Sequence, residues 1–232
     1  MRIIRNLLRK IRYQTKFLGK VNDLNFYISN FNIDNNLTNL MNKYGSDKGG
    51  KNNHHNYSLF YAEIFGTKRK LIKNFLEVGL GTNNTSIPSN MGESGKPLAS
   101  LMAWRDYFPN ANIFGADIDK DILKNDDRIK TCFVDQTDPS TISEMFKNFG
   151  VDKYDIIIED GLHEYNANIT FFENSISHLS NDGIFIIEDI YYKDIKKFKK
   201  YFSNKSYNFS IIELYHSKNI ANNCLIKITK NA

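Results

Sequence analysis

Short apolar runs alternate with longer stretches of helical periodicity from residue 75 onward. Five apolar runs are predicted strands: Phe75–Gly79, Asn112–Asp117, Thr131–Asp135, Tyr154–Glu159 and Gly183–Glu188. Helical spacing predicts helices near Ser100–Tyr107, Pro139–Asn148, Tyr165–Leu179 and Lys193–Tyr201. Strands that are apolar on both faces and alternate with helices are typical of a parallel sheet covered on both sides.

Two further apolar runs, Ser210–Tyr215 and Cys224–Ile228, have no obvious helix between them, which predicts an antiparallel hairpin. The 232 residues suffice for one large α/β domain and a short appendage. We therefore predict a Rossmann-like, doubly wound α/β fold with a mostly parallel seven-stranded sheet and a C-terminal antiparallel hairpin. The expected division is a short N-terminal helical extension, residues 1–40, followed by the α/β domain, residues 41–232.

The first 20 residues carry most of the basic character of the chain. They hold seven Lys or Arg and no acid, whereas the remainder holds 24 basic and 26 acidic residues. Apolar residues recur there at helical spacing, so we expect a helix that packs on its own domain or on a second subunit of a homo-oligomer. The alternative is a helix lying on an anionic membrane surface. The nearly neutral remainder argues against a nucleic-acid binder.

Compartment signals are few. Arg9, Lys10 and Arg12 interrupt any secretory h-region, and no apolar run approaches the ~20 residues of a membrane span. Cys132 and Cys224 both lie inside apolar strand-like runs, which is not the pattern of a disulfide framework. We therefore expect a cytoplasmic protein, at the inner face of the membrane if the first helix binds lipid.

Polar residues at the ends of the first three predicted strands indicate a nucleotide-type cofactor. The first strand ends in Glu77-Val-Gly79-Leu-Gly81, where glycines let the backbone approach a ligand closely, although the third glycine of the dinucleotide motif is missing. Asp117 ends the second strand, where a ribose diol would lie, and Asp135 ends the third, a usual place for adenine recognition. Each acid alone could equally be a helix cap or turn residue.

In their order, these three strand ends resemble the class I S-adenosylmethionine-dependent methyltransferases. The resemblance implies that Glu77, Gly79 and Gly81 flank the methionine part of S-adenosylmethionine. It also implies that Asp117 holds the ribose and that Asp135 lies near the adenine.

The fourth and fifth predicted strands both end in paired acids. If these strands are neighbours, their backbones lie ~4.8 Å apart, so Asp160, Glu188 and Asp189 can converge. Carboxylates that share a small volume stay ionised only beside a cation, and all-oxygen ligands favour Mg²⁺, with Mn²⁺ or Ca²⁺ as substitutes. The alternative is that these acids cap the following helices. We prefer that alternative for Glu159, because strand alternation turns it away from Asp160.

His163 is the candidate general base. It follows Asp160 by three residues, just past a glycine that permits a tight turn, whereas we interpret His178 and His216 as ordinary structural or surface residues. A sugar hydroxyl is a poor nucleophile until a metal lowers its pKa, and an imidazole can then take the proton.

Together with Tyr44-Gly-Ser-Asp47-Lys48-Gly, His55-Asn-Tyr57 and the segment 100–111, these residues resemble the macrocin and mycinamicin type of sugar O-methyltransferase. The resemblance covers roughly residues 41–190. It implies that Asp160, Glu188 and Asp189 bind Mg²⁺ and that His163 is the base. The loop 82–99 with Ser89 is expected to fold over the cofactor, and the segment 44–57 with Asp47 to line the cofactor or acceptor pocket, although both could be plain surface loops.

The acceptor is the least determined part of this hypothesis. Macrolide-modifying members of the family carry a substantial extra N-terminal domain, whereas about 40 residues precede the core here. We therefore expect a sugar of a bacterial capsule or other surface polysaccharide, presented as a polymer or a nucleotide sugar. A sugar of a small natural product is the alternative. An NAD-dependent oxidoreductase would share the sheet but not explain the second acid cluster, and a non-catalytic cofactor-binding protein would not need His163.

Overall fold

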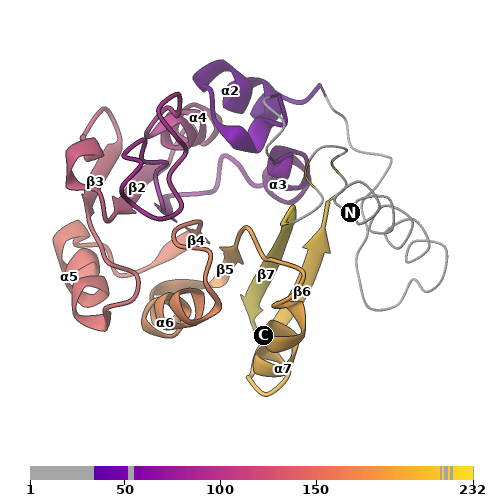
Figure 1. Ribbon diagram of the computed structural model, residues 1–232. Coiled ribbons are helices and arrows are strands. Elements are labelled where there is room, and N and C mark those ends of the chain that lie inside the picture. Colours follow the sequence, from indigo (N-terminus) through magenta and orange to yellow (C-terminus); the bar gives the residue numbers. More distant parts are fainter. Residues whose placement is uncertain (1–33, 52–54, 215, 217–218, 220–221, 232) are drawn as a thin grey trace, which may run out of the picture.

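The computed structural model describes residues 34–51, 55–214, 216, 219 and 222–231 (Figure 1). The predicted basic helix of residues 1–20 lies outside these residues. The strands are β1 (Asn74–Val78), β2 (Asn112–Asp117), β3 (Ile129–Phe133), β4 (Tyr154–Glu159), β5 (Leu179–Ile187), β6 (Tyr207–Glu213) and β7 (Cys224–Lys230). They form one seven-stranded sheet in the order β3-β2-β1-β4-β5-β7-β6.

The first five strands are parallel, and β7 runs antiparallel to both β5 and β6. The predicted doubly wound sheet with an antiparallel end is therefore confirmed. Its order reverses between β1 and β4, and in such sheets ligands bind outside the carboxyl ends of the strands at that reversal.

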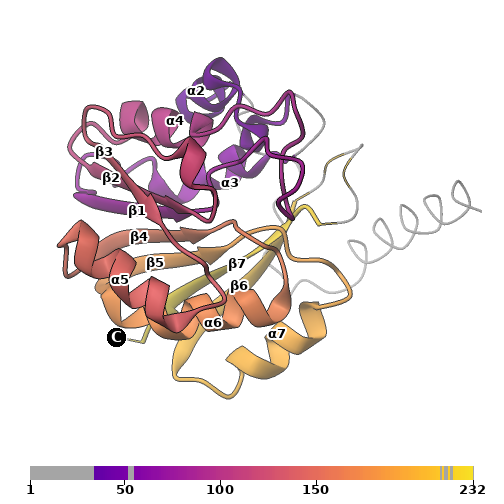
Figure 2. The same ribbon diagram turned by 60° about the vertical axis from the view of Figure 1, so that its left-hand side comes forward.

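Helices cover both faces of the sheet (Figure 2). One face carries α2 (Asn36–Tyr44), α3 (Tyr57–Phe65) and α4 (Ala99–Tyr107), and the other carries α5 (Pro139–Phe149), α6 (Tyr165–Ser175) and α7 (Ile195–Phe202). Short 3-10 turns occupy Asp47–Gly49 (η1), Lys120–Ile122 (η2) and Ile176–His178 (η3). Within the described ranges, no helix combines the length and the apolar composition needed to cross a membrane.

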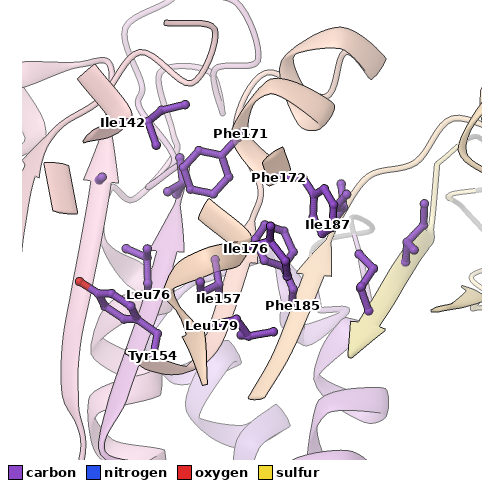
Figure 3. Packing of buried hydrophobic residues seen from close by; sticks show 14 of the residues in the cluster. Leu76, Ile142, Tyr154, Ile157, Phe171, Phe172, Ile176, Leu179, Phe185 and Ile187 are labelled. Carbon is purple, nitrogen blue, oxygen red and sulfur yellow. The ribbon is translucent and has the colours of Figure 1, made fainter. Parts of the chain in front are cut away.

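Strand alternation divides the core into two clusters. On β1, Leu76 faces the helices α5 to α7 (Figure 3), whereas Phe75 faces α2 to α4. The same alternation separates Ile157 from Ile156 and Ile158 on β4, all of which are buried. Because both faces are apolar, β1 and β4 lie in the middle of the sheet, and their polar end residues are brought to its centre.

Local signals explain where the helices begin and end. In α5, the Asp138 side chain accepts a hydrogen bond from the Ser140 amide, Pro139 occupies the first turn, and Gly150 ends the helix in a left-handed conformation. Strand β3 differs from the prediction by beginning and ending two residues earlier. Its pairing with β2 ends where Asp117 lies opposite Phe133, so Asp135 belongs to the loop that follows.

Candidate active site

A cavity of about 610 Å³ opens at the carboxyl ends of the parallel strands. The residues predicted from the sequence that line it are Asp47, Gly79, Gly81, Ser89, Asp117, Asp135, Asp160, His163 and Asp189. Glu77 and Glu188 are fully buried and are not part of this lining. The structure therefore brings both predicted groups of polar residues to one cavity, with two of the acids behind its wall.

The glycine turn after β1 packs against the turn after β4. Gly79 and Gly81 have left-handed φ angles of 89° and 77°. A Cβ atom on Gly79 would lie 2.0 Å from the backbone oxygen of Asp160. Glycine is required here because of this close approach of two backbones, which fixes Asp160 beside the first turn.

The cofactor end of the cavity holds two acids at the positions predicted for them. The Asp117 carboxylate accepts hydrogen bonds from the amides of Leu80 (2.6 Å) and Asp119 (2.8 Å), and burial raises its pKa. A carboxylate has about four acceptor positions, so it can still accept hydrogen bonds from ligand hydroxyls. Ile118, which is 48% exposed, adds apolar surface to the cavity beside it.

Asp135 lies in the loop after β3. Its Oδ1 accepts hydrogen bonds from the amide (2.9 Å) and the hydroxyl (2.6 Å) of Thr137, an arrangement that stabilises the turn. Its neighbours Val134 and Gln136 line the same cavity. Acids next to apolar surface suit a ligand that has both a ribose and a flat aromatic base.

Lys48 lies among the acids of the chemical end. Its side chain is 3% exposed, and Nζ contacts Asp160, Glu188 Oε2 (2.8 Å) and Glu77 Oε1 (3.5 Å). Burial alone would lower the pKa of Lys48, but these carboxylates outweigh burial and raise it well above its usual value. Part of the cationic charge that the clustered acids require is therefore supplied by the chain itself.

The two acids behind the cavity wall are held by side chains of the α2–α4 layer. Glu188 Oε1 accepts a hydrogen bond from the Tyr61 hydroxyl, and Glu77 Oε2 accepts one from Ser100 Oγ (2.7 Å). Burial raises the pKa of Glu77 to about 7 and that of Glu188 well above its usual value, although Lys48 opposes both shifts. In this arrangement both acids contact Lys48 and neither faces the cavity.

Asp160, His163 and Asp189 form the group that could hold a metal ion. Each offers a ligand atom, and these atoms lie within 4.8 Å of one another. His163 Nε2 lies 3.7 Å from Asp189 Oδ2, and His163 Nδ1 lies 4.0 Å from Asp160 Oδ1. Nδ1 is buried and makes no hydrogen bond to any described residue. A buried nitrogen without a hydrogen-bond partner is expected where a bound ion or substrate completes the site.

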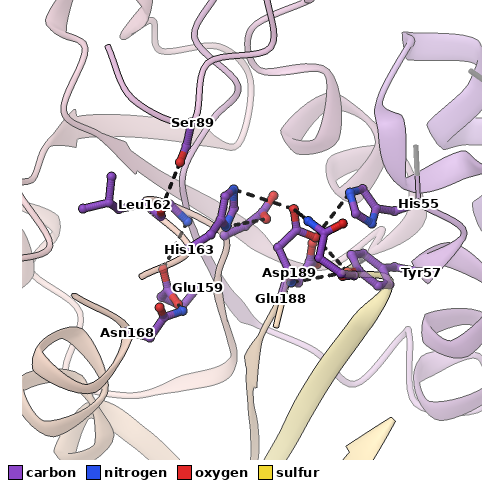
Figure 4. A network of polar contacts seen from close by, with 12 residues as sticks. His55, Tyr57, Ser89, Glu159, Leu162, His163, Asn168, Glu188 and Asp189 are labelled. Carbon is purple, nitrogen blue, oxygen red and sulfur yellow. Dashed lines mark hydrogen bonds and ion pairs between the residues drawn. The ribbon is translucent and has the colours of Figure 1, made fainter. Parts of the chain in front are cut away.

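Asp189 is held from the side opposite His163 (Figure 4). The Tyr57 hydroxyl donates a 2.7 Å hydrogen bond to its Oδ1, and His55 Nε2 lies 3.3 Å from the same oxygen. Asn222 Nδ2 donates a 3.3 Å hydrogen bond to Oδ2. The sequence motif of His55 and Tyr57 pointed to the pocket in general, but nothing in its spacing identified Asp189 as the partner.

Backbone strain gathers at this cavity. Of the non-glycine residues that the structure describes, five have a positive φ, and Ser89 (59°), His163 (59°) and Asp189 (55°) line the cavity. Such conformations cost about 1–3 kcal/mol each and persist where the surroundings hold them. Their concentration here supports a functional site.

The charge state of His163 depends on the neighbouring acids. Burial alone would lower its pKa, but the charges of Asp189 and Asp160 outweigh burial and raise it. A cation bound between these carboxylates would oppose their effect, which favours the neutral imidazole that a general base requires.

Comparison with known proteins gives no matching family model. Curated relatives include the 8-demethyl-8-alpha-L-rhamnosyl tetracenomycin-C 2'-O-methyltransferase of Streptomyces olivaceus, 29% identical over 66% of this chain and 37% of that protein. The L-olivosyl-oleandolide 3-O-methyltransferase of Streptomyces antibioticus is 32% identical over 67% of this chain and 37% of its own length. The demethylmacrocin O-methyltransferase of Streptomyces fradiae is 29% identical over 67% and 36%.

This chain is also similar to solved structures of a methyltransferase. The MycE methyltransferase from the mycinamycin biosynthetic pathway, in complex with Mg, SAH and mycinamycin VI, superposes with a TM-score of 0.56 and 26% identity over 67% of this chain and 39% of that one. A second MycE structure, with Mg and SAH, gives a TM-score of 0.58 and 25% identity over 71% and 39%.

The fold is thus that of the S-adenosylmethionine-dependent methyltransferases, as predicted. More narrowly, the homologues of this chain are sugar O-methyltransferases of tetracenomycin, oleandolide, macrocin and mycinamicin compounds. The chain spans little more than a third of the length of the curated relatives it matches. The names of these relatives refer to rhamnosyl tetracenomycin-C, L-olivosyl-oleandolide and demethylmacrocin.

Proposed function

We propose that this protein transfers a methyl group from S-adenosylmethionine to a sugar hydroxyl, with a divalent ion, Mg²⁺ or Mn²⁺, in the site. The observation that carries the proposal is the convergence of two groups of residues on one cavity. Gly79, Gly81, Asp117 and Asp135 line this cavity together with the cluster of Asp160, His163 and Asp189. The relatives support the same reaction.

The residues at the cavity fit both the cofactor and the ion. Asp117 and Asp135 would bind the ribose and adenine, while Asp47 and Ser89 line the same cavity on separate segments. Asp160 and Asp189 would hold the ion, and Glu188, the third predicted ligand, would join them by exchanging its contact with Lys48. Glu77 would not contact the cofactor directly. It would support the cavity wall through its contacts with Lys48 and Ser100.

When bound, the cofactor supplies an electrophilic methyl group and the ion lowers the pKa of a coordinated hydroxyl. His163 accepts the hydroxyl proton, and Asp189, close to Nε2, stabilises the resulting imidazolium. The deprotonated sugar hydroxyl would be the nucleophile for the methyl group that the bound cofactor would supply, and S-adenosylhomocysteine would be the leaving group. Tyr57, His55 and Asn222 keep Asp189 in place throughout.

For the acceptor, we propose the sugar of a small glycosylated natural product, supported by the names of the relatives. The assay described below also includes polysaccharides, because the sequence led us to expect a polysaccharide sugar. We also propose that residues 41–232 form the methyltransferase domain, in a cytoplasmic protein. A membrane contact or a subunit interface made by residues 1–20 stays a prediction.

The proposal is tested by following S-adenosylhomocysteine formation with Mg²⁺ and a panel of rhamnosyl and other deoxysugar glycosides, beside capsule-type polysaccharides and nucleotide sugars. We expect turnover with a glycoside, its loss in EDTA and its return with added Mg²⁺. Asp160→Asn should be inactive yet still bind S-adenosylhomocysteine, because the cofactor end is built from other strands. Full activity after exhaustive metal removal would exclude the metal mechanism. A melting-temperature rise with NAD but not with S-adenosylhomocysteine would instead favour the oxidoreductase.

A further inference from the structure

Glu159 is a fully buried carboxylate that the proposed reaction does not use. It ends β4 directly before Asp160 and faces away from it, as strand alternation predicts. Its carboxylate does not cap the following helix through the first-turn amides. It accepts hydrogen bonds from Gln136 Nε2 (2.8 Å) and the Gly161 amide (3.1 Å). It also accepts one from Asn168 Nδ2 on α6, which lies beside it in Figure 4.

Gln136 also contacts Leu162, which follows Gly161 in the turn between β4 and α6. Its Oε1 accepts a 2.7 Å hydrogen bond from the amide of Leu162. The fit is close, because a Cβ atom on Gly161 would lie 1.7 Å from that oxygen. The carbonyl of Leu162 accepts a 2.9 Å hydrogen bond from Ser89 Oγ. Both backbone groups of Leu162 are thus held by side chains from distant segments.

The turn held in this way carries both Asp160 and His163. His163 has a φ of 59°, a conformation that residues with a side chain rarely adopt. It lies between the end of β4 at Glu159 and the start of α6 at Tyr165, outside the regular hydrogen bonds of either element. Its placement therefore depends on the side chains that grip the turn.

We propose that Gln136, Glu159 and Asn168 form a positioning network for His163 and Asp160. The proposal rests on the proposed function for its effect on turnover. Gln136 directly follows Asp135 in a loop that lines the cofactor end of the cavity. The network therefore makes the position of the base dependent on the loop that faces the cofactor. Glu159 and Asn168 are not part of the cavity lining, so they act through the turn, whereas Gln136 both grips the turn and lines the cavity.

The test uses Gln136→Ala and Asn168→Ala, each of which removes one amide from the Glu159 carboxylate. Asn174→Ala is the matched control, because Asn174 is exposed on the same helix and donates only to the Thr170 carbonyl among the contacts described for it. Hydrogen–deuterium exchange of the peptide containing Leu162 reports on the turn without any reaction. Calorimetry with S-adenosylhomocysteine reports on the cofactor end, and initial rates separate kcat from KM.

We expect faster exchange at the Leu162 peptide in both variants and a loss of about 10–100-fold in kcat, the range for residues that orient a metal or catalytic site. In Asn168→Ala, KM for the acceptor and the affinity for S-adenosylhomocysteine should change less than about threefold, because Asn168 does not line the cavity. Asn174→Ala should match the wild type. Glu159→Gln should keep most of kcat, because the Asn168 amide can turn its oxygen toward the new amide.

Unchanged exchange at the Leu162 peptide in Gln136→Ala and Asn168→Ala would overturn the proposal. So would faster exchange with wild-type kcat, because the turn would then move without consequence for the base. If the wild type methylates no acceptor in the panel, the proposed function fails. The exchange result still decides whether the network holds the turn.

Discussion

Lys48 and Glu188 form a buried ion pair in which Nζ lies 2.8 Å from Oε2, with side chains 3% and 0% exposed. The lysine belongs to η1, outside the sheet, whereas the glutamate directly follows β5. Because Nζ also contacts Glu77 and Asp160, it joins the ends of three neighbouring strands, β1, β4 and β5. A single ammonium thus organises the floor of the chemical end of the cavity.

Replacing this lysine should be costly. Lys48→Met keeps the length of the side chain but leaves buried carboxylates without their cation, so we expect the free energy of unfolding to fall by about 3–5 kcal/mol. Chemical denaturation measures the change. Lys43→Met is the control, because the Lys43 side chain is 64% exposed and its Nζ makes only a long contact, 4.0 Å, with Asp106 Oδ2. It should change the free energy of unfolding by less than about 0.5 kcal/mol. Equal effects of the two substitutions would contradict the role given to the buried pair.

The raised pKa of Glu77 predicts that stability falls with rising pH. The unfolded chain releases this proton near 4.5, whereas the folded protein keeps it until about pH 7. Between these values the folded state binds more protons, so about 3 kcal/mol of stability present at low pH is lost as the pH rises.

Urea denaturation of the metal-free protein at about pH 5 and about pH 8 measures this effect. Glu77→Gln cannot titrate and retains a partner for Ser100, so its loss of stability over this range should be smaller than that of the wild type. An identical pH dependence in both proteins would assign the effect to other groups.

His163→Ala should lose ~10²–10⁴-fold in turnover while keeping affinity for S-adenosylhomocysteine, because a positioned general base contributes about that much. Part of the loss should return at high pH, where hydroxide can take the proton from a coordinated hydroxyl. His178→Ala is the control, since His178 stacks on Phe146 at the start of β5, the opposite end of that strand from Glu188, and should leave turnover unchanged. Wild-type turnover in His163→Ala would move the base elsewhere, with His55 the next residue to examine.

Two left-handed glycines make a matched pair. Gly79→Ala would force a Cβ to 2.0 Å from the Asp160 carbonyl oxygen, whereas a Cβ on Gly92 would meet no described atom within 4 Å. With φ values of 89° and 71°, both substitutions share the conformational cost of about 1–2 kcal/mol. We expect Gly79→Ala to lose much more stability than this shared cost and to lose turnover. Gly92→Ala should lose no more stability than the shared cost and should keep its turnover. Thermal melting and initial rates measure the difference.

Asp117→Ala should weaken binding of S-adenosylmethionine strongly, as measured by calorimetry, and leave divalent-ion binding unchanged. Its carboxylate also supports the Leu80 and Asp119 amides, so a moderate loss of melting temperature is expected as well. The exposed acid Asp121, in the next turn, provides Asp121→Ala as the control with unchanged affinity. Unaltered affinity in Asp117→Ala would remove Asp117 from the cofactor site.

The sequence was sufficient for the architecture because each strand carries its own apolar signal. The bounds of β2 and β4 match the prediction to the residue, and β3 differs because pairing with β2, rather than hydropathy, determines where it ends. The terminal hairpin was also predicted, since a missing helix between two apolar runs leaves few other connections.

The site was only partly predictable for a physical reason. Residues at strand ends, such as Asp117 and Asp160, are positioned by the sheet itself, so a strand prediction places them. Lys48, Tyr61 and Tyr57 reach their acids from the α2–α3 segment, and no periodicity encodes which helix packs over which strand end. Glu159 was placed on the correct side by alternation, but its partners come from a loop and a helix whose approach is a tertiary property.

The contacts of Lys48 also set an order of events during folding. Its partners Asp160 and Glu188 follow it by 112 and 140 residues along the chain. Contacts between residues this far apart form slowly, since a long loop must close before they can stabilise the chain. During synthesis, Lys48 emerges long before either partner exists. The contacts of Lys48 can therefore be completed only after β5 has been made, later than the helices α2 to α6 that precede it can form.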